Sequence, residues 1–569
     1  MKKKLLLSGV FSAMALTGIA QQNALPAAPV SGELQVKAGT GNINPFTAKL
    51  QLNLSGRQFS LKPYVGIGVV SKSGSGKLED QCLFYNGSSN VYSSSLETSA
   101  KGNVYNYGLT GSYRFNPFSQ LTFGVDGSYS ALHGYGSRIE TMTDMLSSKP
   151  QDKAFKSDID QPTLTTTSIK ANVAYHHRLK DNTETSFLLK GNISRESTDN
   201  ENTIQALSGV GQLPFQQNYL HQDNVTTSAS VGGEYQRLFA GNQAIYVGLH
   251  YDYRHIESDN LQLIDKDKKT DELFKHDMNV AGLYADYKLT YEALNLNARL
   301  EYTYTDMNGK DLHDVIPSIN ATYHLTASQD VQLGYVMRVV RPDVSYLNPA
   351  KVYGAYTIDY GTADLEGIHI NNFSFSHILK SKAVRFSTTV SHIRANDGFN
   401  AIWMIQNGMR VSFWGNEGIR RAWSVSPVLN WTISPLTTLD ARVVVLWDKR
   451  IAEAINMAKE HWGITTYLGL KQQLPAGFKL LAHADYSEGN TIDLYSHAGK
   501  SVNYGGELQR AFLKGNKLNL SLSYENTDYA KTILTQGVDV PNGPKGYTGV
   551  IYARPKHHHI LSVSANWKF

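Results

Sequence analysis

The sequence predicts an all-β fold: a transmembrane antiparallel β-barrel of roughly 22 strands with short periplasmic turns and long extracellular loops. Three observations predict it: an N-terminal export signal, a period-two alternation of apolar and polar residues, and connections that alternate between short and long. The composition suits a folded chain, since 41% of the 569 residues are hydrophobic. Beyond the N-terminus, no apolar run reaches the ~18 residues that a membrane-spanning helix needs.

Residues 1–20 have the pattern of a secretory signal peptide. Three lysines precede the apolar run Leu5–Leu16, and Gly18 and Ala20 suit the positions before a signal-peptidase cleavage site. The run is too short for a membrane anchor, and no Cys beside the cleavage site could accept a lipid. We therefore expect a signal peptide (1–20), a short N-terminal segment (21–31) and an outer-membrane β-barrel (32–569).

Period-two alternation recurs along the mature chain. In Leu294–Tyr304, leucine, alanine and tyrosine alternate with asparagine, arginine, glutamate and threonine, and Phe46–Ser55 and Lys517–Glu525 repeat the pattern. Because side chains of a strand alternate between its two faces, each segment has one apolar and one polar face. The segments reach the ~9–11 residues that a tilted membrane-spanning strand needs, whereas strands of soluble sandwiches are usually shorter.

The connections separate a membrane barrel from a soluble sandwich. Short turns are expected at 116–117, 180–183, 241–242, 326–329, 381–382, 434–435, 475–477 and 514–516, and long polar stretches near 74–99, 133–161, 198–221, 258–274, 342–367 and 530–557. Strands are expected near 33–40, 46–55, 58–72, 101–115, 119–132, 163–179, 184–197, 223–239, 243–257, 276–290, 293–307, 314–325, 329–341, 368–380, 383–396, 410–433, 437–449, 460–474, 477–488, 500–513, 516–528 and 558–569. This even count would leave both termini on the periplasmic side.

Aromatic residues gather near the ends of many predicted strands. Tyr302, Tyr304 and Trp447 suit the girdle where lipid headgroups meet hydrocarbon, although tyrosine and tryptophan are also good strand residues in general. The last strand ends in Trp567 and Phe569 on one face, which resembles the assembly signal of outer-membrane barrels. We therefore expect the barrel-assembly machinery and outer-membrane lipid as partners.

Charge and cysteine content exclude several other classes. Of the 54 basic residues, three belong to the signal peptide, so the mature chain is nearly balanced against 49 acidic residues and nucleic acid is not an expected partner. The single Cys82 excludes an internal disulfide framework. His557–His559 and His176-His177 are weak metal candidates, because adjacent strand residues face opposite sides. We expect no metal, cofactor or catalytic residue, and no enzyme.

The predicted inner face carries charges whose role stays open. They form either a substrate path or a wetted wall in which opposite charges pair across strands. These residues are Lys49, Arg299, Glu301, Asp440, Arg442, His483, Asp485 and Glu525.

One segment carries a family resemblance. The opening Gly32–Gly41 and the run 50–64 resemble the first hairpins of TonB-dependent receptors, and more specifically the outer membrane protein beta-barrel family. The best match is the Arg-Pro…Leu-Asn-Pro segment, here Arg341, Pro342, Tyr346, Leu347, Asn348 and Pro349, followed by the degraded stretch 361–367. The resemblance implies that this segment leaves a mid-barrel strand and enters an external loop.

The resemblance also implies a role in binding or uptake of nutrients at the cell surface. Residues 21–31 are too few to form the plug domain of such receptors, so we expect the wide lumen to be filled by inward-folded loops, a separate plug protein or a surface lipoprotein. The alternative is a non-transporting scaffold or assembly partner in an outer-membrane complex. Tyr353, Tyr356 and Tyr360 are candidate ligand contacts, unless they pack against neighbouring loops.

Overall fold

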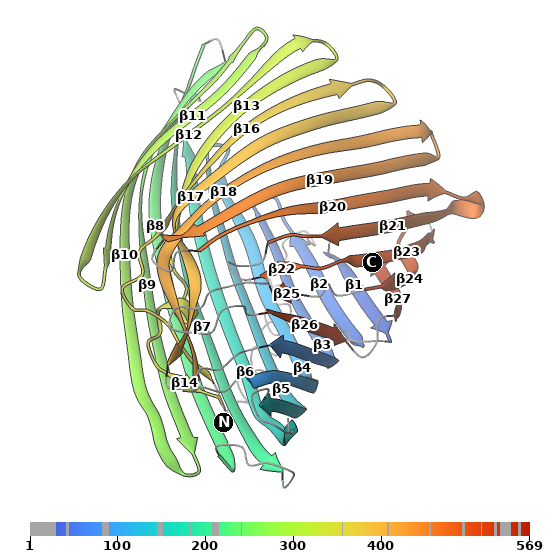
Figure 1. Ribbon diagram of the computed structural model, residues 1–569. Helices are drawn as coiled ribbons and strands as arrows, with labels where there is room; N and C mark the ends of the chain where they lie inside the picture. Colours follow the sequence, from blue (N-terminus) through green and yellow to red (C-terminus); the bar gives the residue numbers. More distant parts are fainter. Residues whose placement is uncertain are drawn as a thin grey trace, which may run out of the picture.

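The computed structural model describes residues 30–40, 45–81, 90–144, 152–180, 182, 184–207, 215–240, 242–354, 357–406, 409–453, 457–491, 496–513, 515–527, 532–534, 548–555 and 559–569. Within these ranges, 22 strands pair antiparallel in sequence order and form the wall of a closed barrel (Figure 1). No helix among the described residues is both long and apolar enough to cross a bilayer. The predicted fold class is therefore confirmed.

Each predicted strand corresponds to one strand of the wall. The wall strands are β1 (Val30–Gly39), β2 (Phe46–Ser55), β3 (Phe59–Gln81), β4 (Asn90–Asn116), β5 (Ser119–Asp144), β6 (Asp152–Arg178), β7 (Thr185–Leu207), β8 (Gln217–Phe239), β9 (Gln243–Ile264), β10 (Asp267–Tyr291), β11 (Leu294–Met307), β12 (Lys310–Thr326), β13 (Gln329–Val340), β16 (Ile368–Lys380), β17 (Val384–Gln406), β18 (Met409–Ser434), β19 (Thr437–Ala452), β20 (Met457–Gln473), β21 (Phe478–Glu488), β23 (Ser501–Phe512), β24 (Leu518–Asn526) and β27 (His559–Lys568). The shorter elements are α2 (Val344–Leu347), β14 (Val352–Tyr353), β15 (Thr357–Tyr360), η2 (Pro475–Gly477), β22 (Ser496–Ala498), β25 (Thr532–Leu534) and β26 (Thr548–Pro555).

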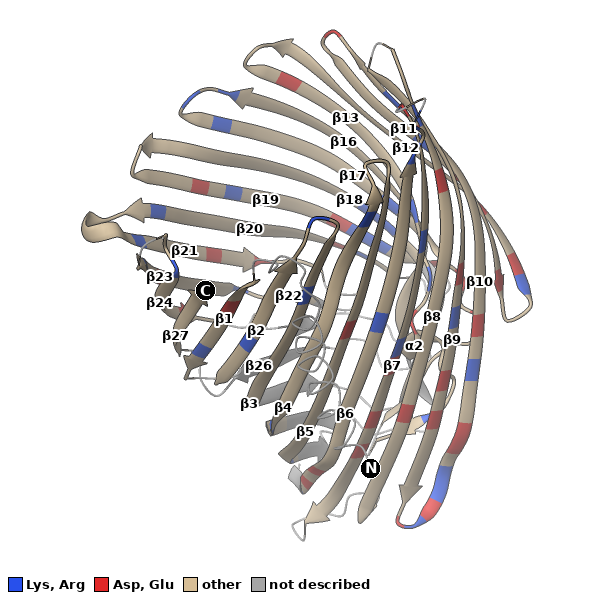
Figure 2. Cartoon of the chain, turned by 180° about the vertical axis from the view of Figure 1, so that it is seen from behind, with Lys and Arg blue, Asp and Glu red and all other residues tan. Residues whose placement is uncertain are grey.

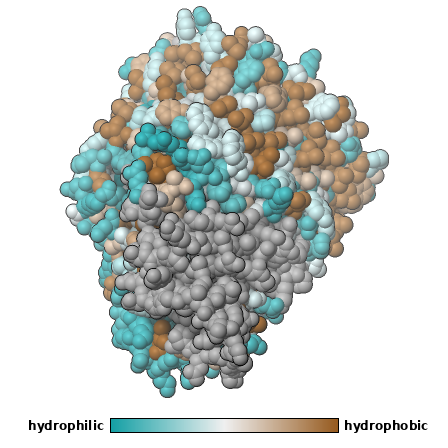
Figure 3. Space-filling model, viewed as in Figure 1, coloured by the Kyte–Doolittle hydropathy of each residue, from teal (hydrophilic) through white to brown (hydrophobic). Residues whose placement is uncertain are grey.

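The outer face of the wall is apolar. Leu249, Leu283 and Tyr302 lie opposite one another on β9, β10 and β11, and they are 62%, 57% and 46% exposed. Exposed apolar side chains at every second position suit contact with lipid. Figure 3 shows apolar residues over much of the upper half of the molecule in this view. Tyrosines of the predicted aromatic girdle lie at the outer edge of this apolar face. The Tyr302 hydroxyl hydrogen-bonds to His313, and the Tyr304 hydroxyl donates to Asp311.

The long outer connections differ from the sequence prediction. The stretches 74–99, 133–161, 198–221 and 258–274 were expected to be loops, yet the ladder continues through most of each of them. Strands β9 and β10 are joined by only Asp265 and Lys266, both at positive φ. Polar side chains remove the period-two signal where both faces meet water, but neighbouring backbones still pair in register. Acidic and basic residues accordingly concentrate along the lower parts of β7–β10 in Figure 2.

The last outer connection also adds to the wall. Strand β26 pairs with the outer part of β3, and β25 pairs with β22 and β26. Strands β25 and β26 fall within 530–557, which was predicted to be a loop. The short turns at the other rim agree with the prediction where the structure describes them.

The barrel closes where β1 pairs with β27. Gly32 and Phe569 exchange two backbone hydrogen bonds, each 3.0 Å long. The Phe569 ring covers Gly32, because a Cβ built on Gly32 would lie 2.3 Å from Phe569 Cζ. Trp567 and Phe569 are 46% and 41% exposed on the lipid face. Their role as an assembly signal stays a prediction. The position of the Phe569 ring explains why residue 32 is a glycine, since a larger side chain would clash with the ring.

We predict that Gly32→Val weakens barrel closure. The added side chain must displace the Phe569 ring, and overpacking of this kind costs about 1–3 kcal/mol. The measurement is the urea midpoint of the barrel refolded in lipid vesicles, followed by tryptophan fluorescence. Gly191→Val on β7 is the matched control, since its Cβ would meet nothing closer than 3.6 Å. Equal midpoints for the two variants would contradict this account of the seam.

Candidate lumen site

The connection between β13 and β16 folds into the barrel. It is an outer connection, as the resemblance implies, and it bends inward to contact Ser258 and Gln262 on the face of β9 opposite to the lipid-facing Leu249. Asn260 lies between these two residues on the same face. These three polar residues are 0–1% exposed, which is possible only if something covers the inner wall. We call residues 341–367 the inward segment. It contains α2, β14 and β15, and β14 lies within the ring of strands in Figure 1.

The inward segment begins with a buried ion pair. Arg341 donates from one guanidinium nitrogen to Asp314 at 2.5 Å and to the hydroxyl of Thr305 at 2.9 Å. The Asp314 side chain is only 4% exposed, and its second oxygen lies 2.6 Å from His369 Nε2. A buried carboxylate is tolerated only when it is paired and hydrogen-bonded. These contacts tie the start of the segment to β11, β12 and β16.

The short helix α2 is held by its caps. The Asp343 carboxylate accepts from the backbone N–H of Val344 at 2.6 Å, and it also pairs with Arg254 of β9 at 2.9 Å. At the other end, the Asn348 side chain donates to Ser258 Oγ at 3.0 Å and accepts from the backbone of Ala350. A carboxylate at a helix N-cap satisfies a free backbone donor. Both ends of α2 are therefore fixed to the inner face of β9.

Wall side chains serve as the hydrogen-bonding partners of β14. Gln262 Oε1 accepts from the Tyr353 backbone N–H at 2.9 Å, and Gln262 Nε2 donates to the Tyr353 carbonyl at 2.8 Å. Asn218 donates to the same carbonyl at 2.9 Å, and Thr270 donates to the Lys351 carbonyl at 2.7 Å. A primary amide has one donor and one acceptor side, so it can pair with a backbone as a neighbouring strand would.

A small apolar core and a row of rings hold the far side of the segment. Leu347 and Leu365 pack with Phe274 of β10, and both leucines are at most 2% exposed. The Tyr346 ring lies 4.1 Å from the Trp414 ring, measured between centroids. Strand β15 pairs in parallel with β18, where the Tyr360 and Phe413 rings stack at 5.7 Å. The inward segment therefore bridges two distant parts of the wall.

Close to the segment, burial changes the titration of one residue. His276 on β10 is 2% exposed and stacks with Phe274. Its neighbours Lys275 and Asp277 face outward, so this level lies beyond the lipid-facing band. Burial, with a smaller contribution from Arg254, lowers the pKa of His276 below its usual value. The ring is therefore neutral near pH 7 and packs as part of the lining.

The structure gathers most of the predicted motif residues in one place. Arg341, Tyr346, Leu347 and Asn348 each make a contact described above, Pro342 is buried, and Pro349 is exposed. Among the candidate ligand contacts, Tyr353 is held through its backbone and Tyr360 stacks on β18, whereas Tyr356 lies outside the described residues. Their contact with a ligand stays a prediction.

Sequence reasoning missed the partners on the wall. The pattern that could have revealed them is the polar series Ser258, Asn260 and Gln262, which alternates with Leu261 and Leu263 along the same strand. The alternation marks an inner face, but it does not identify what covers that face.

Within the membrane band, the inner wall carries the predicted charges as cross-strand networks. Arg299 pairs with Glu301 at 2.6 Å and with Asp286 at 3.3 Å, and it lies 3.8 Å from the Tyr284 ring centroid. Glu301 also contacts His250 at 3.0 Å. Asp440 pairs with Lys471 at 3.1 Å, His483 with Glu525 at 3.2 Å, and Lys49 lies over the Tyr64 ring. The observed pairing favours a wetted, internally paired wall.

Among the described residues, no group of three or more His, Cys, Asp or Glu side chains is arranged to hold a metal ion. His177 Nδ1 lies 2.8 Å from Ser119 Oγ, and His559 Nδ1 lies 2.8 Å from Tyr524 Oη. His557 and His558 lie outside the described residues.

Comparison with known proteins gives the chain a family. Residues 177–529 match the model of the outer membrane protein beta-barrel family, and this range includes the whole inward segment. The chain belongs to the outer membrane protein beta-barrel family. It is therefore integral to the outer membrane, and membership supports the prediction of a barrel that is not an enzyme. No curated protein matches the sequence.

Solved structures share the fold of this family member. A single-residue mutant of the ferric enterobactin receptor of Pseudomonas aeruginosa, in complex with enterobactin, has a TM-score of 0.62 at 12% identity, over 95% of this chain and 82% of the receptor. The siderophore receptor PirA of the same organism has a TM-score of 0.57 at 9% identity, covering 96% and 82%. Its ferripyoverdine receptor has a TM-score of 0.57 at 12% identity, covering 96% and 73%. These likenesses show that the chain shares the barrel fold of these structures.

We predict that Arg341→Met releases the inward segment from the wall. The change leaves the Asp314 charge buried without its guanidinium, which costs about 3–5 kcal/mol. Hydrogen exchange at the backbone amides of Asn348 and Thr362, which bond within the segment, should then accelerate at least about a hundredfold.

Lys310→Met is the matched control for this variant. Lys310 pairs with Glu366 of the same segment, but both side chains are nearly half exposed, so the loss should be at most about 1 kcal/mol. If the two variants accelerate exchange equally, the buried pair does not anchor the segment.

Proposed function

We propose that this barrel carries a polar nutrient across the outer membrane and that the inward segment is the fixed constriction of its lumen. The observation that carries the proposal is the set of buried contacts that hold residues 341–367 against the inner wall. A loop whose backbone polar groups are hydrogen-bonded by the wall narrows the interior on the side where it is held. The receptor-type fold and the charged inner wall support a path for a hydrophilic solute.

A separate plug or a surface lipoprotein is the partner that we propose for the remaining lumen. A barrel of 22 strands is wide and is normally plugged. The inward segment is anchored on β9–β12 and on β18, and this supports a constriction on that side of the interior. A partner recruited to the outer rim would meet the long paired extensions of β3–β10.

The proposal predicts a low conductance that rises when the inward segment is released. The test is single-channel recording of the purified protein in planar bilayers, for the native chain and for the triple variant Arg341→Met, Asn348→Ala, Gln262→Ala. Each substitution removes a side chain that fixes the segment, so the triple variant should show larger and more variable openings. Lys310→Met should behave like the native chain.

A wide, constantly open pore in the native protein, or identical conductance in the triple variant, would contradict the constriction. A second measurement separates transport from a scaffold role. Deletion of the gene should impair growth on at least one of a panel of sole nutrient sources. Stoichiometric partners in mild detergent with no growth defect would instead favour the scaffold.

A further inference from the structure

A row of aromatic side chains crosses four neighbouring strands on the outer face. His392 of β17 lies opposite Trp423 of β18, Trp423 opposite Trp447 of β19, and Trp447 opposite Trp462 of β20. Trp423 and Trp462 are 51% and 70% exposed, and the His392 and Trp423 rings lie 4.4 Å apart. Tryptophan on a lipid-facing wall marks the boundary between hydrocarbon and headgroups.

The spacing along β18 places this row at the outer boundary. Below Trp423, the outward face continues through Val425 and Trp431 to Ile433, beside the short turn between β18 and β19. The ten-residue step from Trp423 to Ile433 is about 34 Å along the strand and about 25 Å along the membrane normal at the usual tilt. This is the height of the apolar band of a barrel, so the row lies where outer-leaflet headgroups begin.

One step further out, the same faces carry cations. Arg394 lies opposite Arg421, Arg421 opposite Lys449, and Lys449 opposite Glu460. Lys449 pairs with Glu460 at 2.5 Å, and Arg394 has a long contact of 3.4 Å with Asn396. None of the described residues forms a hydrogen bond or ion pair with the exposed Arg421 side chain. Like charges directly opposite each other on a sheet are unfavourable, so this arrangement calls for an anion.

The geometry suits a phosphate. Neighbouring strands lie about 4.8 Å apart, so guanidinium groups on β17 and β18 can bind the same anionic group. Arginine forms paired hydrogen bonds with phosphate oxygens, and this makes it the preferred residue for phosphate recognition. The tryptophans would contact the acyl chains of a lipid molecule. The phosphate of its headgroup would then lie at the height of the arginines.

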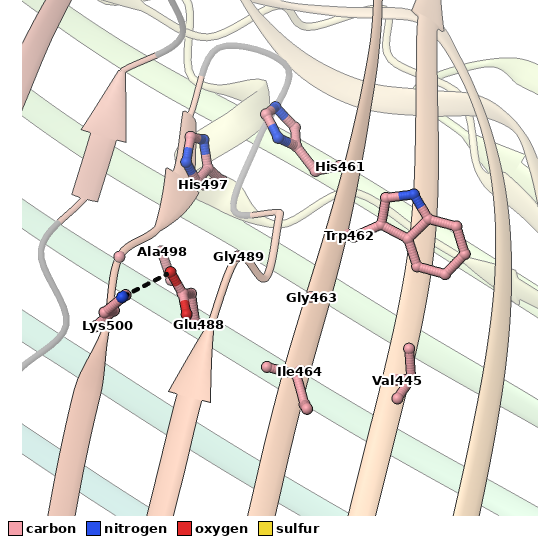
Figure 4. Close-up of a pocket in the computed structure, with 11 residues that line it drawn as sticks. Val445, His461, Trp462, Gly463, Ile464, Glu488, Gly489, His497, Ala498 and Lys500 are labelled. Carbon is pink, nitrogen blue, oxygen red and sulfur yellow. Dashed lines mark ion pairs between the residues drawn. The ribbon is translucent and has the colours of Figure 1, made fainter.

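A hollow beside the row provides room for more than a phosphate. It has a volume of about 580 Å³, and its lining includes Val445, Trp462 and Ile464 from the lipid-facing side of β19 and β20 (Figure 4). Its inner end is lined by His461, which lies opposite the inward-facing Asp448, and by His497. Glu488 and Lys500 line it from the β21 side and pair at 3.8 Å. An aromatic face together with a carboxylate and an ammonium suits a sugar with hydroxyl groups.

We propose that Arg394, Arg421 and Lys449, together with this hollow, bind the phosphorylated sugar headgroup of an outer-leaflet glycolipid. The arginines hold the phosphate, the hollow takes part of the sugar, and the tryptophans contact the acyl chains. The arginines and the tryptophans of this site lie on the lipid face, so their contacts with lipid do not depend on the proposed transport through the lumen.

The test is retention of lipid by the full-length protein in native mass spectrometry. The protein is incubated with bis-phosphorylated lipid A, with its dephosphorylated form, or with phosphatidylglycerol. The double variant Arg394→Gln, Arg421→Gln should bind bis-phosphorylated lipid A about 25-fold more weakly, since each cation contributes about fivefold at a lipid surface. Arg421→Lys keeps the charge but loses the paired geometry, so its affinity should be intermediate.

Arg57→Gln on the periplasmic turn between β2 and β3 removes the same charge at the other rim and should bind like the native chain. Heat-modified gel mobility verifies that each variant is folded. Equal binding by the double variant would overturn the site. Equal binding of phosphatidylglycerol and lipid A would overturn glycolipid recognition in favour of general attraction to anions. Equal binding of the dephosphorylated form would overturn the role of the phosphate.

Discussion

The requirement that every backbone polar group in hydrocarbon has a partner determines this structure. A sheet with free edges would leave unpaired N–H and C=O groups in lipid, each at a cost of several kcal/mol. The pairing of β1 with β27 removes both edges at once. This pairing also explains the aromatic C-terminus. Phe569 completes the backbone hydrogen bonds with Gly32, and its ring, packed over Gly32, faces lipid.

Closure creates a second problem, which is a wide and polar interior. Part of this interior is filled by charges of the wall that pair with one another, as Arg299 does with Glu301 on its own strand and with Asp286 on β10. The inward segment fills another part of the interior, and it is held there mainly by side chains of the wall. Gln262 and Asn218 bind the backbone of β14, while Asp314 holds Arg341. The interior is therefore shaped by specific polar contacts, which fix one position of the segment.

Period two made the wall predictable from sequence. A strand with one face in lipid and one in water has an alternation such as that of Leu294–Tyr304, and each such segment proved to be a strand. The outer extensions were mistaken for loops, because a strand with water on both faces needs no alternation. Lys72–Asp80, for example, pairs with β4 at every residue, although all but one of its residues are serine, glycine or charged.

The placement of the inward segment could not be predicted in this way. Its partners on β9 are Arg254, Ser258 and Gln262, which lie about ninety residues earlier in the chain. A local pattern reports which face a residue lies on, whereas the choice between an external and an inward loop depends on contacts between distant segments. The motif residues and their place in an outer connection were therefore predicted, but the sequence could not show that this connection is one that folds inward.

On β18 and β19, the strand register decides which charged residues face the lumen and which face the lipid. Arg420 points inward and bonds the buried Asp448 at 2.9 Å, while Arg421, the next residue, points outward beside the tryptophan row. Arg450 reaches the same carboxylate from β19 at 3.4 Å. A one-residue slip would exchange the faces, which would separate Asp448 from its inner partners and turn the lipid-facing tryptophans toward the lumen. The buried ion pairs of the inner wall therefore also fix the cations of the outer wall at the height of the headgroups.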